Sequence, residues 1–76
     1  MNIGEMVTQA ICDVKRVKKD QFNPTTSLRD EMGFDDLDIW ELLCAIESES
    51  QLELDDIEFK KLNTPKEIED YVATKV

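Results

Sequence analysis

The chain has 76 residues, 41% of them hydrophobic and 36% charged, so we expect one small domain over residues 1–76 without room for a large enclosed active site. Its net charge of -9 argues against nucleic acid or an anionic membrane as a partner, because phosphates would be repelled. A partner surface is therefore expected to be basic. Without a long apolar run or a signal peptide, the sequence also predicts a cytoplasmic protein with no membrane span.

The first predicted helix begins after Asn2, whose side chain can cap it. Its apolar residues recur at spacings of three and four, which is typical of an amphipathic helix. They are Ile3, Met6, Val7, Ala10, Ile11, Val14 and Val17. Four basic residues follow at its carboxyl end, where they suit the helix dipole, and a solvated helix end explains them without a ligand: Lys15, Arg16, Lys18 and Lys19.

A long loop is expected from Asp20 to Met32, where helical periodicity disappears. Asn23-Pro24-Thr25-Thr26 predicts a turn, and Ser27 with Asp30 can start one helical turn. Scattered apolar residues can pin this loop to the rest of the fold. They are Phe22, Leu28 and Met32.

The central predicted helix follows the break at Gly33, with Asp35 or Asp36 as its cap. It carries two apolar stripes, so one can face the core while the other forms an exposed docking surface beside acidic residues. Burial of both stripes in a small bundle is the alternative. The core stripe contains Ile39, Leu42, Leu43 and Ile46; the second contains Leu37, Trp40 and Cys44, near Asp36, Glu41 and Glu47.

Two further helices are predicted towards the C-terminus. Asp55 can cap a short helix, and Thr64-Pro65-Lys66-Glu67 is a strong start signal for the last one. The short helix carries Ile57, Phe59 and Leu62, and the last carries Ile68, Tyr71, Val72 and Val76. The sequence therefore predicts an all-α four-helix bundle of three longer helices and one short third helix, with a long loop between the first two.

No catalytic or metal site is predicted. The chain contains no histidine, and Cys12 and Cys44 are best explained as free thiols, with a disulfide as the minor alternative. Asp36, Asp38 and Glu47 have the spacing of three calcium-loop positions, but the intervening residues do not fit such a loop. Because nucleophile and phosphate-loop motifs are also missing, we expect a protein that is not an enzyme.

Acidic residues are concentrated in the middle of the chain. Ten lie between Asp35 and Glu58, and this stretch contains no Lys or Arg. A field of one sign can steer a basic partner, although a merely solvated acidic face is the alternative.

A motif at the start of the central helix closely resembles that of the acyl carrier protein family, G-x-D-S-L-D followed by an apolar residue, Glu and Leu. Here it reads Gly33-Phe34-Asp35-Asp36-Leu37-Asp38, then Trp40-Glu41-Leu42. The resemblance implies an acyl-carrier four-helix bundle, a monomer, that shuttles acyl or aminoacyl thioesters in fatty-acid, polyketide or related biosynthesis. A weaker likeness is to D-alanyl carriers. Its implied partners are basic surfaces of acyl-processing enzymes and of phosphopantetheinyl transferase, bound through Asp35, Leu37, Asp38, Trp40, Glu41, Cys44 and Glu47.

The resemblance fails at one position. The family attaches 4′-phosphopantetheine to the serine of this motif, and Asp36 stands there instead. A carboxylate offers no hydroxyl nucleophile, so we expect no attachment to this chain. Asp36 keeps a negative charge at the helix start. An engineered change in a working carrier and a natural variant both remain open, as does an arm-less interaction or regulatory protein that keeps only the docking surface.

Overall fold

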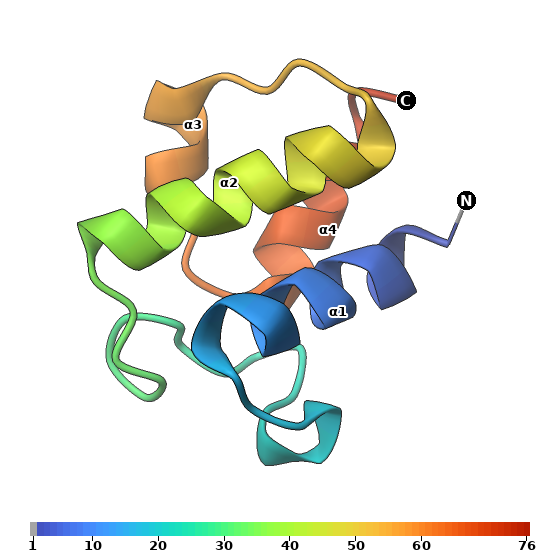
Figure 1. The fold of residues 1–76 in the computed structure, drawn as a ribbon. Coiled ribbons are helices and arrows are strands. Elements are labelled where there is room, and N and C mark those ends of the chain that lie inside the picture. The colour runs from blue at the N-terminus through green and yellow to red at the C-terminus, as the bar shows by residue number, and fades with distance from the viewer. Residues whose placement is uncertain (1) are drawn as a thin grey trace.

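Four α-helices form a bundle in the computed structural model, which describes residues 2–76 (Figure 1). Helix α2 packs against α1 and α3, and α1 also packs against α4. The described residues contain no strand, so the predicted all-α bundle with a short third helix is confirmed. In chain order the elements are α1 (Ile3–Lys15), the 3-10 helix η1 (Lys19–Gln21), α2 (Asp36–Ser50), α3 (Asp56–Lys60) and α4 (Pro65–Ala73).

Every α-helix begins at a side-chain cap. In each case a side-chain oxygen accepts a hydrogen bond from the backbone N–H three residues later, at distances from 2.8 to 3.2 Å. Such a cap contributes about 1 kcal/mol to helix stability. The predicted helix starts are therefore confirmed, with Asp35 rather than Asp36 as the cap of α2. The four caps are Asn2, Asp35, Asp55 and Thr64.

Three helix ends differ from the sequence prediction. Helix α1 ends at Lys15, because Arg16 adopts a left-handed conformation with φ of 56° and its N–H bonds to the carbonyl of Cys12. Val17 therefore lies outside the helix, and η1 follows where only a loop was expected. Apolar periodicity does not mark such a stop, since the next apolar residue still has helical spacing. Leu62 and Val76 likewise lie beyond α3 and α4.

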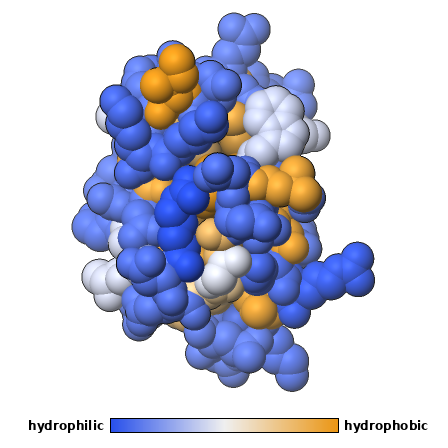
Figure 2. Space-filling model, turned by 90° about the vertical axis from the view of Figure 1, so that its left-hand side faces the viewer, coloured by the Kyte–Doolittle hydropathy of each residue, from blue (hydrophilic) through white to orange (hydrophobic). Residues whose placement is uncertain are grey.

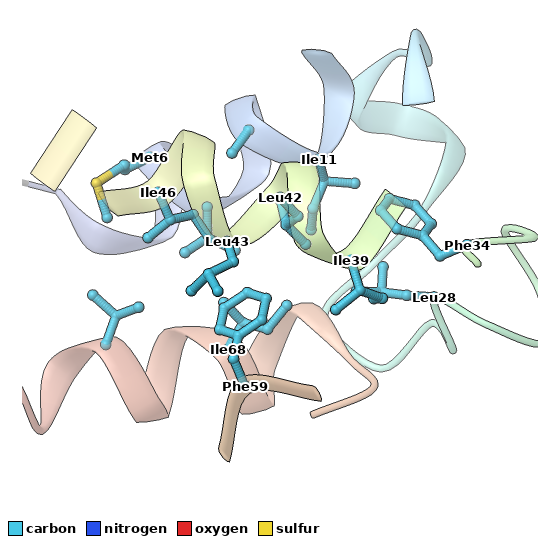
Figure 3. Close-up of a cluster of buried hydrophobic side chains, with 13 residues drawn as sticks. Met6, Ile11, Leu28, Phe34, Ile39, Leu42, Leu43, Ile46, Phe59 and Ile68 are labelled. Atoms are coloured by element: carbon cyan, nitrogen blue, oxygen red, sulfur yellow. The ribbon is translucent and has the colours of Figure 1, made fainter. Parts of the chain in front are cut away.

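One apolar stripe of α2 is buried. Ile39, Leu42, Leu43 and Ile46 point into a core that α1, α3 and α4 complete, as Figure 3 shows. Leu37 and Trp40 on the other stripe are exposed, so the alternative in which both stripes are buried is wrong. The remaining members of the core are Met6, Val7, Ala10, Ile11, Leu28, Phe34, Phe59, Ile68 and Val72.

The long loop before α2 is held by the connection between α3 and α4. The Leu28 N–H donates to the Asn63 carbonyl at 2.7 Å, and the Arg29 N–H donates to Asn63 Oδ1 at 3.2 Å. Asn63 Nδ2 also donates to Ser27 Oγ at 2.8 Å. Leu28 is fully buried, while Phe22 and Met32 are partly buried, which confirms the predicted apolar anchors. Asn63 thus holds the loop that leads into α2 through both its backbone carbonyl and its side chain.

Candidate docking site at the start of helix α2

Helix α2 begins at one end of the bundle, at the left of Figure 1. Gly33 turns the chain towards it with a positive φ of 73°, a conformation that glycine adopts readily. Asp35 then caps the helix and Asp36 is its first residue. The Asp36 side chain is 86% exposed. The position that the sequence motif marks is therefore open to solvent.

Apolar side chains are exposed beside this position. Leu37 is 61% exposed and Trp40 is 54% exposed, while Cys44, one turn further along, is half-buried. Ile57 of α3 is 64% exposed, although the sequence suggested no outward role for it. A helix of five residues is too short for periodicity to tell its two faces apart. Figure 2 looks onto this side of the molecule and shows separate hydrophobic patches surrounded by hydrophilic surface.

The predicted docking acids differ in how far they are engaged within the chain. Glu41 is exposed and takes part in none of the ion pairs of residues 2–76. Asp35 serves as the helix cap, and Glu47 accepts a hydrogen bond from the Leu54 N–H at 3.0 Å. Asp38 is only 20% exposed. Glu41 is therefore the acid most available to a partner.

Lys15 ties the end of α1 to the start of α2. Its Nζ lies 2.9 Å from Asp38 Oδ2 and 3.1 Å from the Gly33 carbonyl oxygen, and 5.4 Å from the centre of the Phe34 ring. The hydrogen bond from Lys15, followed by that from the Asp35 N–H, holds the pKa of Asp38 below its usual value. The interpretation of Lys15 as part of a solvated helix end is thus wrong. Sequence reasoning missed this role because the two partners are distant in the chain.

The Lys15→Met variant is expected to be less stable than the wild type at neutral pH, and the difference should shrink in acid. Because the folded pKa of Asp38 lies below the ordinary value of 3.8, the stability from this pair is present above that value. It is lost as the pH falls through the folded pKa. Urea unfolding at neutral and strongly acidic pH measures the difference. Lys19→Met, at an exposed site, is the control, and a pH-independent difference for Lys15→Met would contradict the expectation.

Asp36 forms an ion pair with Arg29 of the preceding loop, with 3.0 Å between Asp36 Oδ1 and Arg29 Nη1. Beside it, a small crevice separates α2 from α3. The crevice volume is about 20 Å³, which is room for about one water molecule. This crevice is therefore too small for an acyl chain in this conformation. Its lining is Asp36, Ile39, Trp40, Leu43, Asp56, Phe59 and Lys60.

Neither a metal cluster nor a disulfide is found within residues 2–76. No group of three or more Cys, Asp or Glu side chains there is arranged to hold a metal ion. Cys12 and Cys44 are free thiols, as expected, and burial raises the pKa of Cys12. Within the same residues, none of the helices combines the length and apolar character needed to cross a membrane.

The fold defines this chain as a small all-α domain built from four helices. Comparison with known proteins gives the family. The phosphopantetheine attachment site family matches residues 5–72. Acyl carrier proteins from two strains of Nitratidesulfovibrio vulgaris, DP4 and Hildenborough, are each 35% identical over 75 residues, covering 99% of both chains.

A solved structure, that of a candidate acyl carrier protein from Mycobacterium tuberculosis, has the same fold. Its TM-score is 0.86 at 20% identity, and the match covers 96% of this chain and 97% of the other. The chain belongs to the acyl carrier protein family. Members of this family are carrier proteins and not enzymes, in agreement with the sequence analysis. The family model describes a phosphopantetheine attachment site, so the cofactor of the family is 4′-phosphopantetheine.

Proposed function

We propose that this chain docks onto basic surfaces of enzymes that handle acyl or aminoacyl groups in fatty-acid, polyketide or related biosynthesis. The observation that carries the proposal is the pairing of exposed apolar Leu37 and Trp40 with the free carboxylate of Glu41 on the helix that also builds the core. Apolar contact with a rim of charge is typical of docking surfaces. The full proposed surface comprises Asp35, Leu37, Asp38, Trp40, Glu41, Cys44 and Glu47.

The start of α2 does not fit covalent attachment of the cofactor. Loading requires a hydroxyl oxygen that attacks the pyrophosphate of coenzyme A, and Asp36 offers only a carboxylate. Ser27 of the preceding loop is already engaged, since its Oγ accepts a hydrogen bond from Asn63 Nδ2. Ser50 lies at the opposite end of α2, where its buried Oγ donates to the Ile46 carbonyl at 2.6 Å. We therefore propose that the chain, as written, cannot carry the phosphopantetheine arm.

Two functions are compatible with an unloaded chain. The first is a working carrier whose attachment serine has been replaced by Asp36, by engineering or naturally. The second is an arm-less interaction or regulatory protein that occupies the same enzymes without delivering cargo. Both place Asp36 at the start of α2, so the small crevice between α2 and α3 and the ion pair of Asp36 with Arg29 are compatible with either function.

The docking proposal predicts that Glu41→Lys weakens binding to a phosphopantetheinyl transferase by about tenfold at low salt, mainly through slower association. The variant places a positive charge where the partner surface is positive. Asp20→Lys, which makes the same charge change on η1, is the control and should have a smaller effect. Surface plasmon resonance at several salt concentrations measures both. An affinity that responds equally to the two substitutions would contradict docking through α2.

A further inference from the structure

Two basic side chains hold the first turn of α2. Arg29 from the loop contacts Asp36, with 3.0 Å between Nη1 and Oδ1, and Lys15 from α1 contacts Asp38, with 2.9 Å between Nζ and Oδ2. Residues two apart in an α-helix point about 200° apart around its axis. The two cations therefore approach the helix from different sides, and each neutralises one of the acids at its start.

Arg29 is already positioned for this contact by its backbone. Its N–H is bonded to Asn63 Oδ1, the preceding residue Leu28 is fully buried, and the Leu28 carbonyl accepts from the Phe34 N–H at 2.9 Å. A fixed backbone lowers the conformational entropy that the ion pair costs. Asp36, by contrast, remains 86% exposed. The carboxylate of Asp36 is thus accessible to a Lys or Arg of a partner while it is paired with Arg29 of its own chain.

We propose that Arg29 competes with the basic groups of a partner for the carboxylate of Asp36, which lies beside the proposed docking surface at the start of α2. In the free protein its guanidinium neutralises Asp36, and an outside Lys or Arg has to displace it to reach that carboxylate. The inference rests on the proposed docking function and adds an autoinhibitory contact to it. Removal of Arg29 should therefore strengthen the binding of cations at this position, beyond the general effect of one lost positive charge.

The size of the effect follows from the exposure of the pair. Exposed ion pairs contribute about 0.2 to 1 kcal/mol, which corresponds to a change in affinity of about 1.4- to 5-fold. The contribution should decrease with added salt, because exposed charges are screened. Competition of this size adjusts affinity without abolishing docking.

The experiment uses a hexa-arginine peptide as the probe, titrated into the 15N-labelled chain at low salt. Amide shifts of residues 36–40 report binding at the start of α2. Arg29→Gln is expected to bind the peptide there about two- to fivefold more tightly than the wild type. Arg16→Gln is the matched control, since it removes the same charge from a side chain that takes part in none of the ion pairs of residues 2–76.

Two further variants test whether Asp36 is the carboxylate for which Arg29 and the peptide compete. In an Asp36→Asn background, adding Arg29→Gln should raise the affinity for the peptide by no more than Arg16→Gln does. Arg29→Lys, which keeps the charge, should retain most of the competition. Equal gains for Arg29→Gln and Arg16→Gln, or a gain that persists in the Asp36→Asn background, would overturn the inference.

A second binding experiment, with a phosphopantetheinyl transferase, separates this inference from the proposed function. Binding of the same variants to a phosphopantetheinyl transferase should follow the order seen with the peptide. If the enzyme binds none of them, the docking proposal fails while the peptide result still decides the role of Arg29. If the enzyme binds all of them equally and the peptide shows no preference for Arg29→Gln, docking stands and the competition is overturned.

Discussion

Incubation of this chain with coenzyme A and a broad-specificity phosphopantetheinyl transferase is expected to leave its intact mass unchanged. The Asp36→Ser variant is expected to gain the mass of one phosphopantetheinyl group if the chain derives from a working carrier. The physical reason is the nucleophile, because a serine hydroxyl can attack the pyrophosphate and form a stable phosphodiester. A carboxylate would form only an acyl phosphate anhydride, which hydrolyses easily.

The Asp36→Ser variant should fold, so a difference in mass gain between it and the unaltered chain reports on the hydroxyl. Asp35, not Asp36, caps α2, and the Asp36 side chain is 86% exposed, so the change removes only the contact with Arg29. Asp36→Ala is the matched control, since it also removes that contact but supplies no hydroxyl. Refusal of Asp36→Ser by the transferase would favour the arm-less interaction protein. A mass gain on the unaltered chain would contradict the chemical argument.

The largest stability loss is expected for Phe59→Ala. Phe59 is 1% exposed and points from α3 into the core (Figure 3), where its ring meets that of Tyr71 edge to face with 6.5 Å between centroids. Removing a buried Phe costs about 3–5 kcal/mol. A chain of this length has a total stability of about 4–11 kcal/mol, so this loss is a large fraction of the total. Urea denaturation followed by circular dichroism measures the loss.

Ile57→Ala is the control on the same helix. Ile57 is 64% exposed, so its truncation should change the free energy of unfolding by no more than about 0.5 kcal/mol. The two variants share the loss of an apolar side chain from α3 and differ in burial. Equal losses would contradict the assignment of Phe59 to the core and of Ile57 to the surface.

Much of the fold could be predicted because its determinants are local. The caps Asn2, Asp35, Asp55 and Thr64 bond to N–H groups three residues away, so the helix starts are visible in any window of four residues. The spacing of Ile39, Leu42, Leu43 and Ile46 likewise marks the buried face of α2. The motif at Gly33 to Asp38, together with these features, also predicted the family.

Contacts between distant segments could not be predicted. The partners of Asp36 and Asp38 are Arg29 and Lys15, and the loop is fixed by Asn63, far along the chain. No local pattern distinguishes a basic residue that is exposed to solvent at a helix end from one that neutralises an acid on another helix. The early end of α1 at Arg16 was missed for a similar reason, since apolar spacing continues past it.

The amino-acid sequence by itself thus determined the starts of the α-helices, the buried stripe, the family and the missing hydroxyl at position 36, because each depends on residues that are neighbours in the chain. Only the tertiary structure decided that the second stripe of α2 is exposed and not also buried, that Ile57 is exposed, and which acids at the start of α2 are already neutralised. These properties depend on the packing of α1, the loop and α3 around α2, and the strength of a charge or an apolar contact is set by what surrounds it.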